Sequence, residues 1–143
     1  MTMTTEELLE EFEDIDEAVG ALEEGLHAVP MPTIDNALPT CMRLTHRMLD
    51  AYGRYRGCEM PGDDADLLDV LKGFVKGDPS LNAVRDNVRE LVYYRNCIDM
   101  DRREALPASP EKAAVRTVRH IYLYLRTRLL QEERRTVRPL HPM

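Results

Sequence analysis

A chain of 143 residues with a net charge of -7 is long enough to bury one core and too short for two comfortable domains. Hydrophobic residues make up 43% and charged residues 31% of it, a composition typical of soluble globular proteins. No apolar run approaches the roughly 20 residues that a membrane-spanning helix needs, and the N-terminal segment MTMTTEELLEEFEDIDE is acidic where a targeting signal would be basic. We therefore expect a cytoplasmic protein without a membrane segment.

Charge is distributed unevenly along the chain. Residues 1–42 hold eleven acidic residues and no Lys or Arg, whereas residues 111–143 hold eight basic residues against three acidic ones. Opposite charges attract, so the two ends are expected to pair, within one chain or between two. Because the whole protein is acidic, a nucleic-acid partner is not expected.

Apolar residues at helical spacing predict five helices, and no segment alternates with period two for long enough to make a strand. In chain order, the predicted helices cover residues 4–28, 36–56, 64–76, 79–101 and 110–135. Asp78 before Pro79 and Ser109 before Pro110 are typical of helix starts. The predicted fold class is all-α, an up-and-down bundle of four to five helices.

One domain is expected overall, with three parts. An acidic amphipathic helix (residues 1–30) precedes a helical bundle (34–133), and a loose tail (134–143) follows it. The first helix carries the most regular apolar pattern, a 4-3-4-3-4 spacing that forms a narrow seam for partner helices. The seam consists of Leu8, Phe12, Ile15, Val19, Leu22 and Leu26.

A lone helix with so regular a pattern needs another helix to cover it. We expect this seam to bind a partner protein, and we expect the chain to form a homodimer. The pattern leaves open whether the helix packs against its own bundle or against another chain.

Candidate catalytic and metal-binding residues are few. The three cysteines form no C-x-x-C pair, and Glu24-x-x-His27 occurs once, whereas carboxylate-bridged metal bundles use two such pairs. His46 and Asp50 are one turn apart on the second predicted helix, but no serine or cysteine forms a nucleophile motif with a histidine. Phosphate-binding glycine loops and dinucleotide fingerprints are also absent from the sequence. We expect no metal and no cofactor.

Arg95 interrupts an apolar stripe on the fourth predicted helix. The residues of this stripe are Leu81, Val84, Val88, Leu91 and Ile98. A guanidinium is always charged, and burying it without a partner is costly. Arg95 is therefore expected either to form a buried ion pair, with Asp99 or Asp50, or to line a cleft.

The run SLNAVRDNVRELVYYRNCIDMD resembles the signature region of HEPN-domain proteins of the HepT toxin type. In that family an Arg-Asn pair near the end of a helix is followed a few residues later by a histidine. The arginine and the histidine form an RNA-cleaving site, usually across a dimer. The resemblance implies a HEPN-like bundle over residues 34–130 with Arg95 and Asn96 in the signature positions. No histidine follows them at the family's spacing, so the catalytic histidine is missing.

Two functions from different classes follow. The first is a non-catalytic helical interaction module that binds a partner protein and modulates or inhibits it. Loss of the proton-transfer group favours this function, because ribonuclease chemistry needs a proton carrier. The alternative is a HEPN-like ribonuclease toxin of a toxin-antitoxin pair, in which Arg95 and Asn96 act with Asp101 or His120. A contact between Arg95 and Asp101 or His120 would favour the enzyme, and an Arg95 sealed against a carboxylate would disfavour it.

Overall fold

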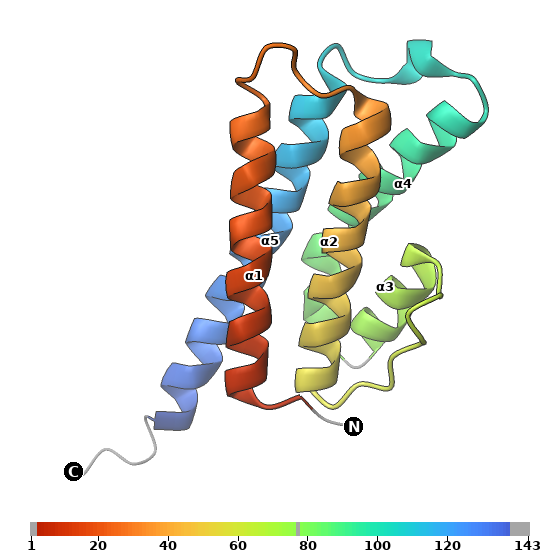
Figure 1. The fold of residues 1–143 in the computed structure, drawn as a ribbon. Coiled ribbons are helices and arrows are strands. Elements are labelled where there is room, and N and C mark those ends of the chain that lie inside the picture. The colour runs from red at the N-terminus through yellow and green to blue at the C-terminus, as the bar shows by residue number, and fades with distance from the viewer. Residues whose placement is uncertain (1–2, 77, 138–143) are drawn as a thin grey trace.

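The computed structural model describes residues 3–76 and 78–137, with side chains up to residue 132. This part of the chain forms five α-helices and two short 3-10 helices and contains no strand, so the all-α class is confirmed (Figure 1). The elements are α1 (Thr5–Gly25), α2 (Ile34–Tyr55), α3 (Leu67–Lys76), η1 (Pro79–Val84), α4 (Arg85–Asp99), η2 (Arg103–Ala105) and α5 (Pro110–Val137).

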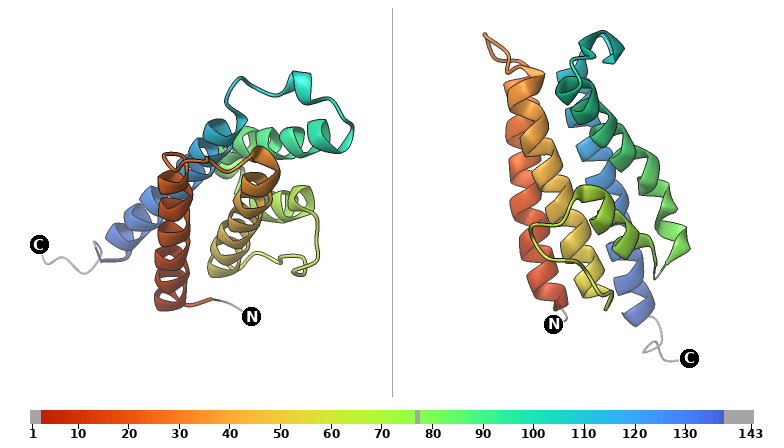
Figure 2. Two further views of the ribbon diagram at one scale, coloured as in Figure 1. Left: turned by 45° about the horizontal axis from the view of Figure 1, so that its top comes forward. Right: turned by 90° about the vertical axis from the view of Figure 1, so that its right-hand side faces the viewer.

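Helix α2 is at the centre of the arrangement, because it contacts each of the other α-helices. α1 and α5 pack against α2 and against each other, and α3 and α4 lie on the side of α2 away from α1 (Figure 1). In the turned views of Figure 2, the short α3 packs against α2 and α4. Residues 134–137 of the predicted loose tail belong to α5, and the rest of that tail lies outside the described residues.

Local signals in the sequence account for several helix ends. The backbone N–H of Glu7 donates to the Thr4 hydroxyl at 3.1 Å, and the N–H of Thr4 donates to the Glu7 carboxylate at 3.0 Å, which forms a capping box at the start of α1. Gly57 follows α2 with a φ of 80°, the left-handed conformation that glycine adopts most readily.

The predicted helix over residues 79–101 is divided in the structure. Residues 79–84 form the 3-10 helix η1, and the α-helix begins only at Arg85. Asp78 caps η1 by accepting a hydrogen bond from the Ser80 N–H at 3.0 Å. The 3-10 helix, which is wound more tightly than an α-helix, still buries Leu81 and Val84. The spacing of apolar residues in this segment therefore does not distinguish the two helix types.

The apolar seam of α1 is covered within the same chain. Leu8, Phe12, Ile15 and Val19 are at most 1% exposed, and Leu22 and Leu26 pack against the same core. The Phe12 ring lies 6.5 Å from the Tyr52 ring of α2 and 5.7 Å from the Tyr122 ring of α5, measured between centroids. This corrects the expectation that the seam binds an external partner: while α1 is docked, these side chains belong to the core.

Attraction between the acidic and basic ends occurs within the chain. Arg119 of α5 donates to Glu23 at 2.8 Å and to Asp16 at 2.6 Å, both on α1. The hydrogen bond from Arg119 lowers the pKa of Glu23, and the same contacts raise the pKa of Arg119. These pairs hold α1 against α5 at their exposed edge, beside the buried seam.

Candidate functional site

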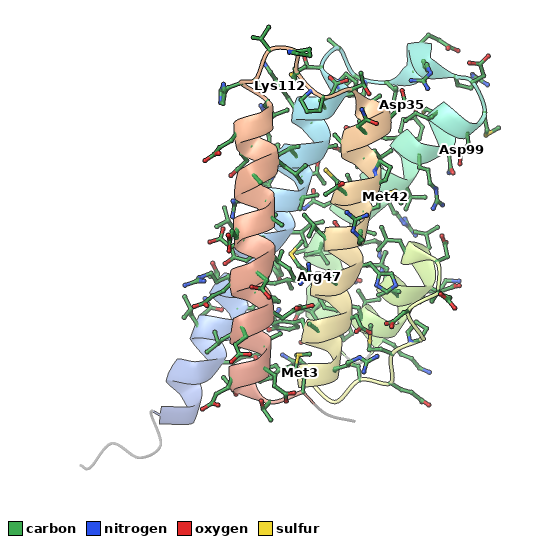
Figure 3. The ribbon with its side chains drawn as sticks, in the orientation of Figure 1. Met3, Asp35, Met42, Arg47, Asp99 and Lys112 are labelled. Atoms are coloured by element: carbon green, nitrogen blue, oxygen red, sulfur yellow. The ribbon has the colours of Figure 1, made fainter. Side chains whose placement is uncertain are left out.

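A pocket of about 750 Å³ opens between α2, α4 and the loop that leads into α3. We call it the α2–α4 pocket. Its apolar lining consists of Leu38, Pro39, Met42, Ala65 and Leu67. Its charged and polar lining consists of Arg43, His46, Arg47, Asp63, Asp64, Asp66 and Arg95. Met42 and Arg47, both labelled in Figure 3, mark the wall that α2 contributes.

Helical periodicity explains why α2 forms one wall of this pocket. Residues four apart along a helix share a face, so Met42 and His46 follow one another on the pocket side, as do Arg43 and Arg47. The opposite face of α2, which includes Met48, is fully buried in the core. α2 is thus amphipathic, and its half-polar face is the one that the other helices leave uncovered.

The loop between α2 and α3 carries the three aspartates of the pocket lining, and Met60 fixes the position of this loop. A Cβ atom at Gly53 would lie 2.4 Å from the Met60 sulfur, so the lack of a side chain at Gly53 lets Met60 pack directly against α2. Gly73 of α3 also faces the Met60 sulfur, which a Cβ atom there would meet at 3.6 Å. Met60 therefore anchors the loop between α2 and α3 just before its acidic residues.

Arg95 lines this pocket rather than the core. Its guanidinium lies 3.4 Å from the carboxylate of Asp66, and the two side chains are 39% and 45% exposed. The predicted partners, Asp99 and Asp50, are replaced by a loop residue that helical spacing could not indicate. A long, exposed ion pair of this kind contributes little, about 0–1 kcal/mol. The Arg95 guanidinium is therefore neither buried nor held by a strong ion pair.

The two α2 arginines in the pocket differ in their partners. Arg47 donates two hydrogen bonds to Glu11 of α1, at 2.9 and 3.1 Å, and this contact raises the pKa of Arg47. Arg43 donates only to the hydroxyl of Thr40, at 3.4 Å, and forms no ion pair within the described part of the chain. Arg43 is thus the pocket cation that is most available to a ligand.

His46 is a half-buried residue of the same pocket lining. Its Nε2 atom is buried and has no hydrogen-bond partner among the described residues. Asp50, one turn later, forms an ion pair with Arg54 at 2.9 Å. A buried polar atom without a partner costs about 1–3 kcal/mol.

The structure does not bring the HEPN-type candidates together. Asn96 lines a separate pocket of about 390 Å³ with Tyr93 and Lys72, because neighbouring residues on a helix point in different directions. Asp101 is exposed just after α4, and His120 is exposed on α5. Neither of them lines the pocket of Arg95.

Sequence reasoning missed the histidine that does share the pocket with Arg95. His46 lies on a different helix, 49 positions before Arg95, and no spacing rule links the two. The available signal was the half-polar face of α2, on which His46 follows Met42. His46 is half-buried, and its proximity to Arg95 could not be deduced from the sequence.

No protein-family model, curated protein or solved structure matches the chain. The resemblance to HEPN-domain proteins therefore stays a prediction. Within residues 3–76 and 78–132, no group of three or more His, Cys, Asp or Glu side chains is arranged to hold a metal ion. Each helix that the structure describes is too short or too polar to cross a lipid bilayer.

Proposed function

We propose that the chain is a non-catalytic helical interaction module, which binds a segment of a partner protein in the α2–α4 pocket and thereby modulates the partner. The observation that carries this proposal is the composition of the pocket. Its apolar residues, which we call the apolar floor, are bordered by charged groups, most of which form weak ion pairs or none within the described part of the chain. A volume of about 750 Å³ lies within the usual range for ligand sites and has room for a few side chains.

Two physical features of the floor support the binding of a peptide segment. Met42 is unbranched and adaptable, so it can pack against apolar side chains of different shapes. Burial of an apolar side chain against such a floor contributes on the order of 0.8 kcal/mol per methylene group. The charged border then determines orientation and selectivity more than it determines affinity.

Substitution of Met42 by aspartate tests the proposal. Random peptides displayed on phage are selected on the immobilised wild-type chain, and the affinities of enriched peptides are then measured by fluorescence anisotropy. We expect Met42→Asp to weaken their binding at least about tenfold, because it places a charge on the apolar floor. Met100→Asp is the matched control, since Met100 is 68% exposed and lies outside the pocket lining.

Two outcomes would contradict the proposal. Either no peptide is enriched above the background of the library, or the enriched peptides bind Met42→Asp as tightly as they bind Met100→Asp. Circular dichroism of both variants checks that the helical fold is retained.

A second candidate function, the HEPN-like ribonuclease toxin, is favoured by one observation: Arg95 and His46 line the same pocket. An imidazole can transfer the proton of a ribose hydroxyl, and a guanidinium can stabilise the charge that develops on a phosphate. The aspartates of the loop wall oppose this function, because they repel an RNA backbone.

Incubation with single-stranded RNA distinguishes the two functions. The interaction module is expected to leave the RNA intact. Cleavage by the wild type that His46→Ala and Arg95→Ala both abolish, and that His120→Ala retains, would establish the ribonuclease instead.

A further inference from the structure

Helices α1 and α5 lie side by side and run in opposite directions (Figure 1). The line along which they meet is marked by two contacts. Arg119 of α5 donates to Asp16 of α1 at 2.6 Å, and on the core side of this ion pair the rings of Phe12 and Tyr122 lie 5.7 Å apart. The position of every other residue on the two helices can therefore be counted from this line.

Helical rotation shows which residues of the pair point into solvent. Successive residues of an α-helix are turned by about 100°. On α1, Ile15 comes just before the contact residue and is buried, whereas Glu17 comes just after it and is exposed. On α5, Val118 is buried and His120 is exposed in the same way. Because the helices are antiparallel, these rotations bring Glu17 and His120 to the same side of the pair, away from the core.

The surface on this side, which we call the α1–α5 face, is acidic on one helix and basic on the other. Its α1 half consists of Glu6, Glu10, Glu13, Glu17 and Glu24. Its α5 half consists of Lys112, Arg116, His120, Leu123, Thr127 and Leu130. No lysine, arginine or carboxylate in either half forms an ion pair within residues 3–76 and 78–132. The two leucines are 49% and 41% exposed. Charges of both signs, each on its own helix, thus remain unpaired beside exposed apolar side chains.

We infer that this face binds the same face of a second copy of the chain, about a two-fold axis that runs along the helices between α1 and α5. Such an axis places α1 of each copy over α5 of the other and keeps each residue at its level along the bundle. Lys112 lies at the end of the face where α1 finishes, so it can meet Glu24 of the second copy (Figure 3). Each acidic half then covers a basic half and its two leucines.

Charge complementarity favours a second copy over other occupants. A nucleic acid would be repelled by the glutamates of α1, and a basic peptide would leave the cations and leucines of α5 uncovered. A second copy supplies both signs of charge in the right places through symmetry alone. The net charge of -7 opposes the association of two chains, so we expect a weak dimer with a dissociation constant on the order of 10–100 μM at low salt.

Two double substitutions each reverse the charge of one half of the face. The α1 variant is Glu17→Lys with Glu24→Lys, and the α5 variant is Lys112→Glu with Arg116→Glu. Glu24 is in the last turn of α1 and Lys112 in the first turn of α5, where the new charges suit the helix dipole, so the fold should be retained. We expect sedimentation equilibrium to show a wild-type dimer that dissociates at high salt, and self-association at least about tenfold weaker in each variant.

Mixing the two variants provides the decisive measurement. The lysines of the α1 variant then meet the glutamates of the α5 variant, and the unchanged halves also complement each other. An equimolar mixture should therefore form a heterodimer about as tightly as the wild type forms its dimer. Lys72→Glu with Lys76→Glu, on α3, is the matched control, because it changes the net charge as the α5 variant does but lies outside the face. It should dimerise far better than the α5 variant.

Three outcomes would overturn the inference. The wild type stays monomeric at low salt up to about 1 mM, both variants dimerise as the wild type does, or their mixture fails to associate. Circular dichroism checks that each variant is folded. The interface leaves the apolar seam of α1 inside each copy, so at high salt the unfolding midpoint should not depend on protein concentration. Peptide binding in the α2–α4 pocket is a separate result, because other helices line that pocket.

Discussion

Replacement of Phe12 by alanine is expected to lower the free energy of unfolding by about 3–5 kcal/mol. Phe12 is 1% exposed in the middle of the α1 seam, and its ring contacts the rings of Tyr52 and Tyr122. The substitution removes both aromatic contacts and leaves a cavity between α1, α2 and α5. Urea unfolding followed by far-UV circular dichroism measures the loss.

Leu9→Ala is the matched control, because Leu9 lies on the same helix and is 36% exposed. We expect it to change the free energy of unfolding by less than about 1 kcal/mol. The measurement also tests whether the seam is covered within one chain. If it were shared between two copies, the unfolding midpoint would rise with protein concentration even at high salt, and such a dependence would contradict the docking of α1 on its own bundle.

The docking of α1 also influences the α2–α4 pocket. Glu11 of α1 binds Arg47 through two hydrogen bonds, so α1 neutralises one of the three arginines that line the pocket. Arg43 and Arg95 are the two arginines of the lining that no α1 carboxylate binds. If the pocket binds a peptide, as proposed, α1 thereby limits the cations that the peptide can contact.

The helices could be predicted from the sequence because their signals are local. Thr4 and Glu7 mark the start of α1, Gly57 marks the end of α2, and the spacing of apolar residues identifies the buried faces. The partner of the α1 seam could not be predicted, because the same heptad pattern suits a helix of the same chain and a helix of another. That choice depends on tertiary packing, which a periodic pattern does not contain.

The pocket could be predicted only in part, for a similar reason. The unusual position of Arg95 was visible, since a charged residue interrupts an apolar stripe. Its partner Asp66 belongs to a loop 29 positions earlier, and its neighbour His46 belongs to another helix. Loop conformation follows from contacts such as that of Met60 with Gly53 rather than from any repeat in the sequence. The sequence therefore predicted Asp99, one turn further along the helix, or Asp50, across the core, as the partner instead.

Substitution of Asp78 by alanine is expected to lower the free energy of unfolding by about 2 kcal/mol, the sum of a lost cap and two lost ion pairs. Asp78 accepts a hydrogen bond from the Ser80 N–H at 3.0 Å and pairs with Arg56 at 3.1 Å and Arg128 at 2.9 Å. These contacts join the end of α2, the start of η1 and α5. Without the carboxylate, Arg128 loses its ion pair, whereas Arg56 keeps its contact with Glu132.

Two further variants separate the cap from the charge. Asparagine is also a good helix cap, so Asp78→Asn should lose about half as much stability as Asp78→Ala, through the ion pairs alone. Asp99→Ala is the control, because Asp99 is exposed and forms no ion pair within the described part of the chain; its effect should stay below about 0.5 kcal/mol. Equal losses for Asp78→Asn and Asp78→Ala would show that the cap contributes nothing.

The pH dependence of Asp78 provides an independent check. Hydrogen bonds from Ser80, and then from Arg128, lower the pKa of Asp78 below its ordinary value of 3.8. Because the carboxylate is more acidic in the folded chain than in the unfolded one, its contribution is complete above the unfolded pKa and is lost as the pH falls through the folded pKa. The stability difference between the wild type and Asp78→Ala should therefore be constant near neutral pH and shrink below about pH 4. A difference that stays unchanged down to about pH 2 would mean that the contacts of Asp78 do not depend on its charge.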